Sequence, residues 1–437
     1  MHLSHELGIP HEGPILPCTF QPGAGELLSS WLVRLAHAHQ VKVHSFCRHL
    51  WPDVAIWNRD VDKLAPAIVL DTLAARTLTP AHRISQMTLP TIIECLTGAP
   101  LTAGQAQASW LMPLGIYHRT HRSHGLVYCP RCLQRDGEAP YYRTSWRLAF
   151  HVVCPTCGIY LHERCPACGK PVNFFRIELG RKSVNADRPI STCYQCAFDL
   201  SQSPACAVSP KTLRRYRSLY RISREGWNQA VPYPHQYFRV LRQIIGLLAS
   251  RSERVRMLQI DLRLRLDQPV VGPAGRVSFE QIALAGRVHL LEQAMWLLAD
   301  WPDRFIAVMR YHRINSTPLL RDMGGAVPFW FNAVVTEQFY VTNVNRRFAF
   351  TAPERSEKGR NQFIAPIKGL VGSPRKNDAK RSCPHCHSHW ISRNGHRESR
   401  QRYECQECRR HFTGAVTLPP TSSKTDCSPH PGAARRS

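Results

Sequence analysis

The placement of cysteine is the feature that most constrains this chain. Twelve of the 17 cysteines in 437 residues form six Cys-x-x-Cys pairs. A Cys-x-x-Cys turn directs two thiolates toward one point, and two such turns complete a tetrahedral zinc site. Taken in chain order, the pairs predict three four-cysteine zinc sites. The predicted ligands are Cys129, Cys132, Cys154 and Cys157 in the first site, Cys165, Cys168, Cys193 and Cys196 in the second, and Cys383, Cys386, Cys405 and Cys408 in the third.

Each predicted site takes all four ligands from the protein, which leaves no open position for a substrate. The zinc is therefore expected to stabilise the fold and not to catalyse a reaction. In the second site, Cys206 is an alternative to Cys193 or Cys196 as a ligand. The remaining cysteines are expected to be small core residues or exposed thiols: Cys18, Cys47, Cys95 and Cys427.

Two other uses of paired cysteines fit less well. Disulfides need an oxidising compartment, and the first residues lack the apolar run of a signal peptide, which favours the cytoplasm. A thioredoxin-like redox site is built on a βαβ unit, and the sequence around the six pairs does not predict one.

The chain is also strongly basic, with a formal net charge of +26. This count treats cysteine as neutral, whereas four thiolates around one Zn²⁺ have a charge of −2, so three sites lower the net charge to about +20. Such a charge predicts a polyanionic partner, and nucleic acid is the default for a protein with zinc ribbons. No stretch approaches 18 uninterrupted apolar residues, so a membrane span is not expected.

The periodicity of apolar residues predicts a mainly α fold, with small β elements at the zinc ribbons. A first helix is expected after Gly25. Two more, at 65–76 and 79–87, are compatible with a helix-turn-helix, with Thr79 and Pro80 at the N-cap and first position of the second. The expected segments are an N-terminal helical domain at 15–125, a double zinc module at 126–206, a second helical domain at 207–350, a linker at 351–382, a zinc ribbon at 383–412 and a disordered tail at 413–437.

The C-terminal ribbon is a candidate nucleic-acid contact. Its Asn394-Gly395 dipeptide predicts the turn of a β-hairpin. Basic residues flank this dipeptide and follow the last cysteine pair, as expected for contacts to phosphates. The alternative is a solvated face on a protein–protein module. The predicted contact residues are Arg393, His396, Arg397, Arg400, Arg402, Arg409 and Arg410.

Three stretches share motifs with one known family. They are GELLSSWLVRLA at 25–36, the segment from Tyr128 to Cys168 with its cysteine pairs and Arg143-x-x-Trp146, and LADWPDRF at 298–305. Together they resemble the TniQ/TnsD family of transposition target-selection proteins, over roughly residues 15–345. Cys157 stands where many relatives have histidine, and a thiolate can replace imidazole on zinc. The C-terminal ribbon instead resembles the zinc ribbons of insertion-sequence proteins.

The resemblance implies a non-catalytic protein of bacterial DNA transposition, located in the cytoplasm with the nucleoid. Such proteins recognise a target, which is either a DNA site or a guide-RNA complex. They then engage an AAA+ ATPase regulator, which brings the transposase to that place. A homodimer is the assembly that the family suggests. The chain has no P-loop of the form GxxxxGK[ST], so the ATPase is expected to be another protein.

Two other functions are weighed against this one. A zinc-ribbon transposase or nuclease needs carboxylates that converge on Mg²⁺. The acids available for that role are Asp60, Asp62, Asp71, Asp300 and Asp303. A free-standing transcription regulator would bind a simple operator site and would need no ATPase partner.

Overall fold

The computed structural model confirms a mainly helical chain with a few short strands. It describes residues 14–102, 105, 107–114, 123–177, 188–269, 278–321, 323, 327–339, 383–387, 391–397, 400–408 and 410–413. The chain divides into two compact units, Met1–Arg347 and Phe348–Ser437. Among the described helices, none is long and apolar enough to cross a membrane.

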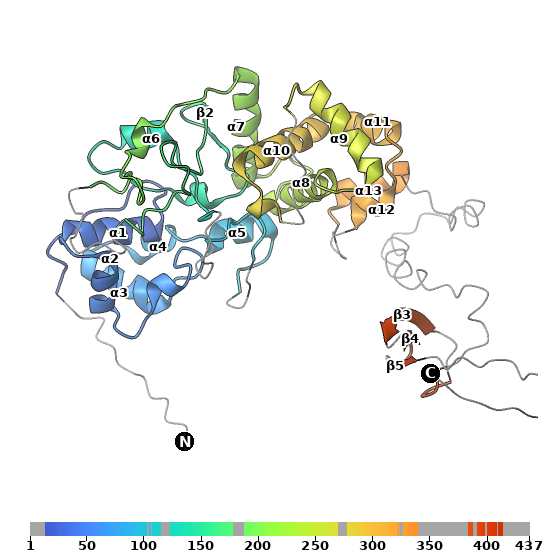
Figure 1. Ribbon diagram of the computed structural model, residues 1–437, viewed down its shortest axis with the longest axis horizontal. Coiled ribbons are helices and arrows are strands. Elements are labelled where there is room, and N and C mark those ends of the chain that lie inside the picture. The colour runs from blue at the N-terminus through green and yellow to red at the C-terminus, as the bar shows by residue number, and fades with distance from the viewer. Residues whose placement is uncertain are drawn as a thin grey trace, which may run out of the picture. The chain divides into compact units, whose positions relative to one another are not determined.

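In chain order, the first unit consists of helices before and after a cysteine-rich segment at 126–206 (Figure 1). The helices before this segment are α1 (Leu28–Ala38), α2 (Val43–Leu50), α3 (Ala67–Thr77), α4 (Ala81–Ser85) and α5 (Pro90–Thr97). The segment itself contains α6 (Pro130–Arg135), the 3-10 helix η2 (Thr144–Arg147) and the antiparallel strands β1 (Val153–Cys154) and β2 (Ile159–Tyr160). The helices after it are α7 (Pro210–Glu225), α8 (Pro234–Leu248), α9 (Glu253–Arg265), α10 (Leu284–Leu298), α11 (Asp303–Tyr311), α12 (Ser316–Leu320) and α13 (Phe329–Phe339).

One hydrophobic core joins these parts of the first unit. Buried residues from Leu16 to Phe339 form a single cluster, to which the predicted segments 15–125, 126–206 and 207–350 all contribute. Trp110 lies where the segments meet, because its ring makes edge-on contacts with Phe150, Phe238 and Phe279 at centroid distances of 5.8, 5.2 and 5.7 Å. Aromatic burial of this kind contributes strongly to stability, so these segments are expected to fold together.

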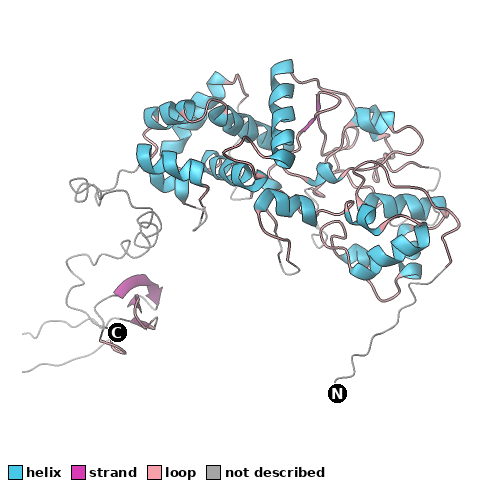
Figure 2. Cartoon of the chain, turned by 180° about the vertical axis from the view of Figure 1, so that it is seen from behind, coloured by secondary structure: helices cyan, strands magenta, loops and turns pink. Residues whose placement is uncertain are grey.

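Helix α8 is the centre of the C-terminal helices and packs against α5, α7 and α10. Its apolar positions recur every three or four residues, as an amphipathic helix requires, and all of them are buried. These residues are Phe238, Leu241, Ile244, Ile245 and Leu248. Figure 2 shows the same arrangement from behind, with helices on both sides of the short β1–β2 hairpin.

Two predicted helix boundaries in the N-terminal part are wrong. Helix α1 begins at Leu28 and not directly after Gly25, because the residues between them hydrogen-bond to the segment at 142–144. Helix α4 has five residues and Pro80 is its N-cap, so the second helix of the suggested helix-turn-helix is much shorter than expected. Beyond the end of α4, the Met87 carbonyl accepts the N–H of Leu28. It thereby satisfies a free donor at the start of α1 and is not available for an intrahelical hydrogen bond of α4.

The second unit contains a three-stranded antiparallel sheet in the order β3 (Ile391–Arg397), β4 (Arg400–Cys405) and β5 (His411–Thr413). The prediction of a turn at Asn394-Gly395 is wrong, because both residues lie within β3, at an irregularity in its pairing with β4. The strands connect beyond Arg397, which pairs with Arg400. Burial of Ile391 and Tyr403 on one face fixes this register.

The predicted tail begins one residue too early, since Thr413 belongs to β5. The remainder of the tail, at 414–437, and the predicted linker at 351–382 lie outside the described residues.

Candidate metal centres

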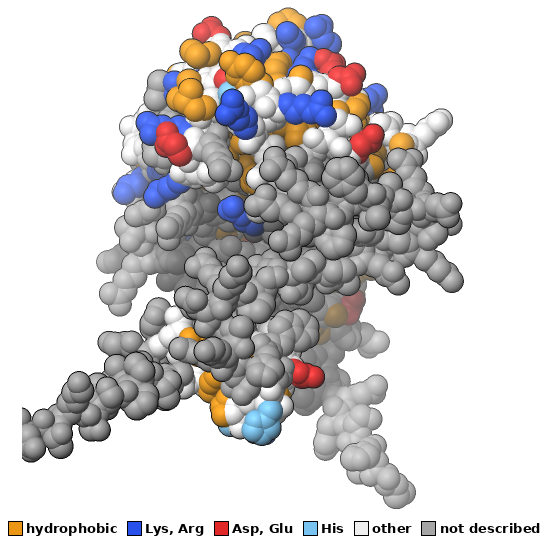
Figure 3. Space-filling model, turned by 90° about the vertical axis from the view of Figure 1, so that its right-hand side faces the viewer, with side chains coloured by type: hydrophobic (Ala, Val, Ile, Leu, Met, Phe, Trp, Pro, Cys, Tyr) orange, Lys and Arg blue, Asp and Glu red, His pale blue; other side chains and the backbone are white. Residues whose placement is uncertain are grey.

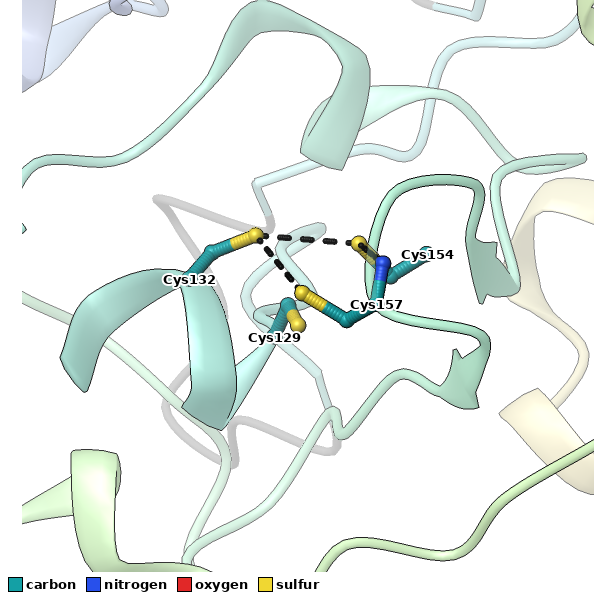
Figure 4. A group of neighbouring side chains, drawn as sticks. All are labelled: Cys129, Cys132, Cys154 and Cys157. Atoms are coloured by element: carbon teal, nitrogen blue, oxygen red, sulfur yellow. Dashed lines mark hydrogen bonds between the residues drawn. The ribbon is translucent and has the colours of Figure 1, made fainter. Parts of the chain in front are cut away.

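The first four-cysteine cluster joins α6 to the β1–β2 hairpin. Cys129 is the N-cap of α6 and Cys132 lies in its first turn, while Cys154 ends β1 and Cys157 follows in the turn to β2. The four sulfur atoms lie within 4.8 Å of one another. The Sγ of Cys132 is 3.6 Å from the Sγ of Cys154 and 3.6 Å from that of Cys157 (Figure 4).

These distances suit a tetrahedral zinc site. With Zn–S bonds of about 2.3 Å, the sulfurs at the corners of a tetrahedron are about 3.8 Å apart. The sulfurs of a disulfide are only about 2.05 Å apart. The donor set, four soft thiolates with no carboxylate or water position, is also typical of structural zinc.

The second cluster forms from Cys165, Cys168, Cys193 and Cys196, whose sulfurs also lie within 4.8 Å of one another. The Sγ of Cys165 is 3.6 Å from that of Cys196, and the Sγ of Cys168 is 3.7 Å from that of Cys193. Cys206 is exposed and is not part of the cluster. Its carbonyl accepts the N–H of Tyr160 beside β2, so the chain at Cys206 is used to extend the hairpin.

The third cluster lies in the second unit and joins the turn at Cys383–Cys386 to the end of β4. The Sγ of Cys383 is 3.6 Å from that of Cys408, and the Sγ of Cys386 is 3.5 Å from that of Cys405. Within the described ranges, the three groups of metal-ligating residues are these cysteine clusters. The structure thus brings together every cysteine set that the sequence predicts.

Of the other cysteines, Cys18 is exposed and Cys95 is half-buried. Cys47 is buried and its Sγ accepts a hydrogen bond from the Trp57 indole at 3.3 Å. Cys427 lies outside the described residues.

A buried ion cluster connects η2 to the start of α1, and sequence reasoning missed it. The Arg147 guanidinium donates to Asp60 at 2.6 Å and to Asp62 at 3.2 Å, and also to the Met112 carbonyl at 3.1 Å. Asp62 in turn accepts the backbone N–H and the hydroxyl of Ser29 at 2.8 and 2.7 Å. A carboxylate at this position satisfies a free N–H of α1 and interacts favourably with its dipole.

A second polar junction lies one turn away, around Glu26. This buried carboxylate accepts hydrogen bonds from the Gly23 N–H at 2.8 Å, the Ser30 hydroxyl at 2.8 Å and the Arg34 guanidinium at 2.6 Å. Burial raises the pKa of Glu26, and the charge of Arg34 opposes that rise. The Ser30 hydroxyl oxygen also accepts the N–H of Tyr142 at 3.0 Å, so the junction attaches α1 to the cysteine-rich segment.

The aspartates considered for a Mg²⁺ site do not converge. Asp60 and Asp62 meet only at Arg147, with which both form ion pairs. Asp300 pairs with Arg304 on the surface, and the two remaining acids, Asp71 and Asp303, are exposed on α3 and α11. No three acidic groups among the described residues are close enough together to hold a metal ion.

The predicted nucleic-acid contacts fall on the sheet of the second unit. Arg393, His396 and Arg397 lie in β3, and Arg400 and Arg402 lie in β4. The register places Arg397 opposite Arg400 at the end of the hairpin. Arg410 is exposed just before β5, and Arg409 lies outside the described residues.

Comparison with known proteins supports the assignment that these motifs suggest. No curated protein matches the chain. The TniQ family model matches residues 17–161, a range that includes α1 to β2, both polar junctions and all four cysteines of the first cluster. The match does not extend to the C-terminal ribbon, whose resemblance to insertion-sequence proteins stays a prediction. The chain thus contains a TniQ domain at residues 17–161, which indicates a protein associated with DNA transposition.

Proposed function

We propose that this protein is a non-catalytic accessory factor of DNA transposition, which recognises a target and recruits an AAA+ ATPase regulator and, through it, the transposase. The observation on which this depends is the TniQ domain at residues 17–161, with the first cysteine cluster inside it. The target is DNA or a nucleic-acid complex such as a guide-RNA complex. We place the protein in the bacterial cytoplasm, with the nucleoid, as a homodimer.

We propose zinc as the metal of all three clusters, with the twelve paired cysteines as its ligands. Bound zinc would stabilise the thiolate form of each cysteine and crosslink segments that have little hydrophobic core of their own. In the first cluster these segments are α6 and the β1–β2 hairpin. The third cluster is especially dependent on metal, because its buried core consists of two cysteines with Ile391 and Tyr403.

The C-terminal ribbon is our candidate for one contact with nucleic acid. Its sheet places Arg397 opposite Arg400, next to the connection between β3 and β4. Two like charges at paired positions repel each other, and a phosphate between them relieves the repulsion. We propose that residues 383–413 fold as a separate ribbon at the end of a linker at 351–382.

Nucleic acid captured with the native protein would test this function. The protein is purified from its own cells after mild crosslinking and at moderate salt, the bound nucleic acid is sequenced, and bound proteins are identified by mass spectrometry. An enriched duplex site with an AAA+ ATPase supports direct target reading, and an enriched guide RNA with the ATPase supports recognition through a complex. A featureless spread of sequences without an ATPase would contradict the proposal.

The double variant Arg397→Ala/Arg400→Ala tests the contribution of the ribbon in the same experiment. It should lower the amount of captured nucleic acid if the ribbon makes the contact. The ATPase should still be recovered with this variant, since the TniQ domain is unchanged.

A further inference from the structure

Helix α7 presents a face that is almost entirely cationic. Its exposed residues are Pro210, Lys211, Arg214, Arg217, Arg221, Arg224 and Glu225. The five cations follow one another at intervals of three or four residues, which is the spacing of neighbours on one side of an α-helix. The opposite side is apolar and contacts the core through Tyr216, Leu219 and Tyr220. The cations therefore form a continuous stripe, named here the α7 stripe.

The α7 stripe is not neutralised within the part of the chain that the structure describes. No ion pair joins Lys211, Arg214, Arg221 or Arg224 to another described residue. Neighbouring like charges at this spacing destabilise a helix, so a bound polyanion would stabilise this one. A charged face can simply be solvated, but such faces commonly contain both signs of charge.

Helix α9, by contrast, has arginines that are neutralised by acidic residues of the same helix. Arg256 pairs with Glu253 at 3.7 Å, and Arg265 pairs with Asp261 at 2.9 Å. The end of the first unit with α9 and α11 faces the viewer in Figure 3, where Lys and Arg side chains alternate with hydrophobic and acidic ones. The α7 stripe differs because Glu225, at its last position, is the one acidic residue of the helix.

Helix α7 is attached to the Cys154–Cys157 turn of the first cluster and to β1. The Arg217 Nε donates to the carbonyl of Pro155, inside the Cys154–Cys157 turn, at 2.9 Å. The Tyr220 hydroxyl donates to the Val153 carbonyl at 2.7 Å, and Ser209 caps the helix by accepting the N–H of Thr212. Helix α7 accordingly stands beside β2 in Figures 1 and 2. These contacts fix the backbone of α7, so the helix itself need not be ordered on binding.

The dimensions suit the backbone of a double helix. From Lys211 to Arg224 the rise is about 20 Å at 1.5 Å per residue. Duplex DNA carries one charge per about 1.7 Å of its axis, so a stripe of this length faces several phosphates. Single-strand binding sites add exposed aromatic rings for base stacking, whereas Tyr216 and Tyr220 of α7 are both buried.

From this geometry we propose that the α7 stripe binds the phosphate backbone of duplex DNA without reading its sequence. The site is additional to the C-terminal ribbon and belongs to the first unit. The choice of DNA as the polyanion rests on the proposed role in transposition. In this arrangement the α7 stripe holds DNA beside the TniQ domain, whatever element reads the target.

The test is the salt dependence of DNA binding by the full-length protein loaded with zinc. The variant Arg214→Ala/Arg221→Ala/Arg224→Ala removes three of the five charges of the α7 stripe, and alanine preserves the helix. With about 0.9 counterion released per phosphate contact, the slope of log K against log salt should fall by about 2.7 for a random-sequence duplex. Over a fourfold rise in salt, the wild-type affinity should then decrease about 40-fold more than that of the variant.

The control Arg256→Ala/Arg265→Ala/Arg310→Ala removes the same charge from exposed positions on α9 and α11. Its slope should stay close to that of the wild type. An equal decrease in both variants, no decrease in the α7 variant, or stronger binding of duplex RNA than of DNA would overturn the inference. The capture experiment described above separates the two proposals. If a target is enriched but the α7 variant has the salt slope of the wild type, only this inference is refuted. If the α7 variant has a decreased salt slope but no target is enriched, only the proposed function is refuted.

Discussion

Replacing Arg147 by methionine should destabilise the first unit far more than the loss of an ordinary surface arginine. Its side chain is 1% exposed, and it forms ion pairs with Asp60 and with Asp62, whose side chain is 3% exposed. Methionine fills much of the same space but has no charge, so the two carboxylates remain close together without a counterion. Removing one partner of a buried ion pair costs about 3–5 kcal/mol.

The loss should depend on pH, because Asp62 can be protonated. Burial raises its pKa to about 6, against the opposing charge of Arg147, so the variant should have a still higher value. An acid whose pKa is raised by folding contributes stability at low pH, and this contribution is lost as the pH rises through the folded-state pKa. The difference between wild type and variant should therefore be small near pH 5 and grow above pH 6.

The assay is urea unfolding of the zinc-loaded protein at several pH values, followed by tryptophan fluorescence. The control is Arg265→Met. The Arg265 side chain is 49% exposed and pairs with Asp261 on the surface, so its loss should lower the free energy of unfolding by less than about 1 kcal/mol. The triple variant Asp60→Asn/Asp62→Asn/Arg147→Met leaves no unpaired charge and should recover part of the loss. Equal effects of Arg147→Met and Arg265→Met, or a difference that does not change with pH, would refute this reasoning.

Three further results are expected. Cys129→Ser should lose one zinc per chain by metal analysis and unfold the cysteine-rich segment, because structural zinc supplies about 10–16 kcal/mol of folding free energy; a full metal content with normal melting would exclude Cys129 as a ligand. Arg397→Ala/Arg400→Ala should lower the salt slope of nucleic-acid binding by about two units, and an unchanged slope would place the ribbon contact elsewhere. Deletion of residues 348–437 should leave the first unit folded, since it is a separate compact unit, and aggregation of residues 1–347 would argue against that boundary.

The cysteine clusters could be predicted from sequence because their geometry is local. A Cys-x-x-Cys turn places two sulfurs side by side whatever the rest of the fold does, so only the pairing of turns had to be inferred. Order along the chain was sufficient for that step, but it left Cys206 open as a ligand of the second site, and only the fold excludes Cys206 from that cluster. The helical stripe of α8 was predictable for a similar reason, since apolar positions at Phe238 and Leu241 repeat within one element.

The polar junctions could not be predicted, because their partners are distant in sequence. Arg147 and Asp62 are 85 positions apart, and neither belongs to an apolar pattern or a known ligand spacing. The end of α4 at Ser85 could not be predicted for the same reason, because the Met87 carbonyl accepts a hydrogen bond from Leu28, which is distant in sequence. Local preference was overridden at Asn394-Gly395 too, where burial of Tyr403 decided the strand register.

The net charge of the chain also could not be interpreted from sequence alone, because the sequence does not show which arginines are exposed. Sequence alone counts every arginine equally, yet in the fold Arg242 forms an ion pair with Glu280, and Arg239 donates to the Met323 carbonyl. Such arginines stabilise the helical part and are poorly placed to bind DNA. The cations of the α7 stripe remain exposed, and Arg217 attaches that stripe to the turn of the first cysteine cluster. We therefore expect metal binding and DNA binding to be coupled in this unit, because the zinc that we propose would shape the Cys154–Cys157 turn against which α7 packs.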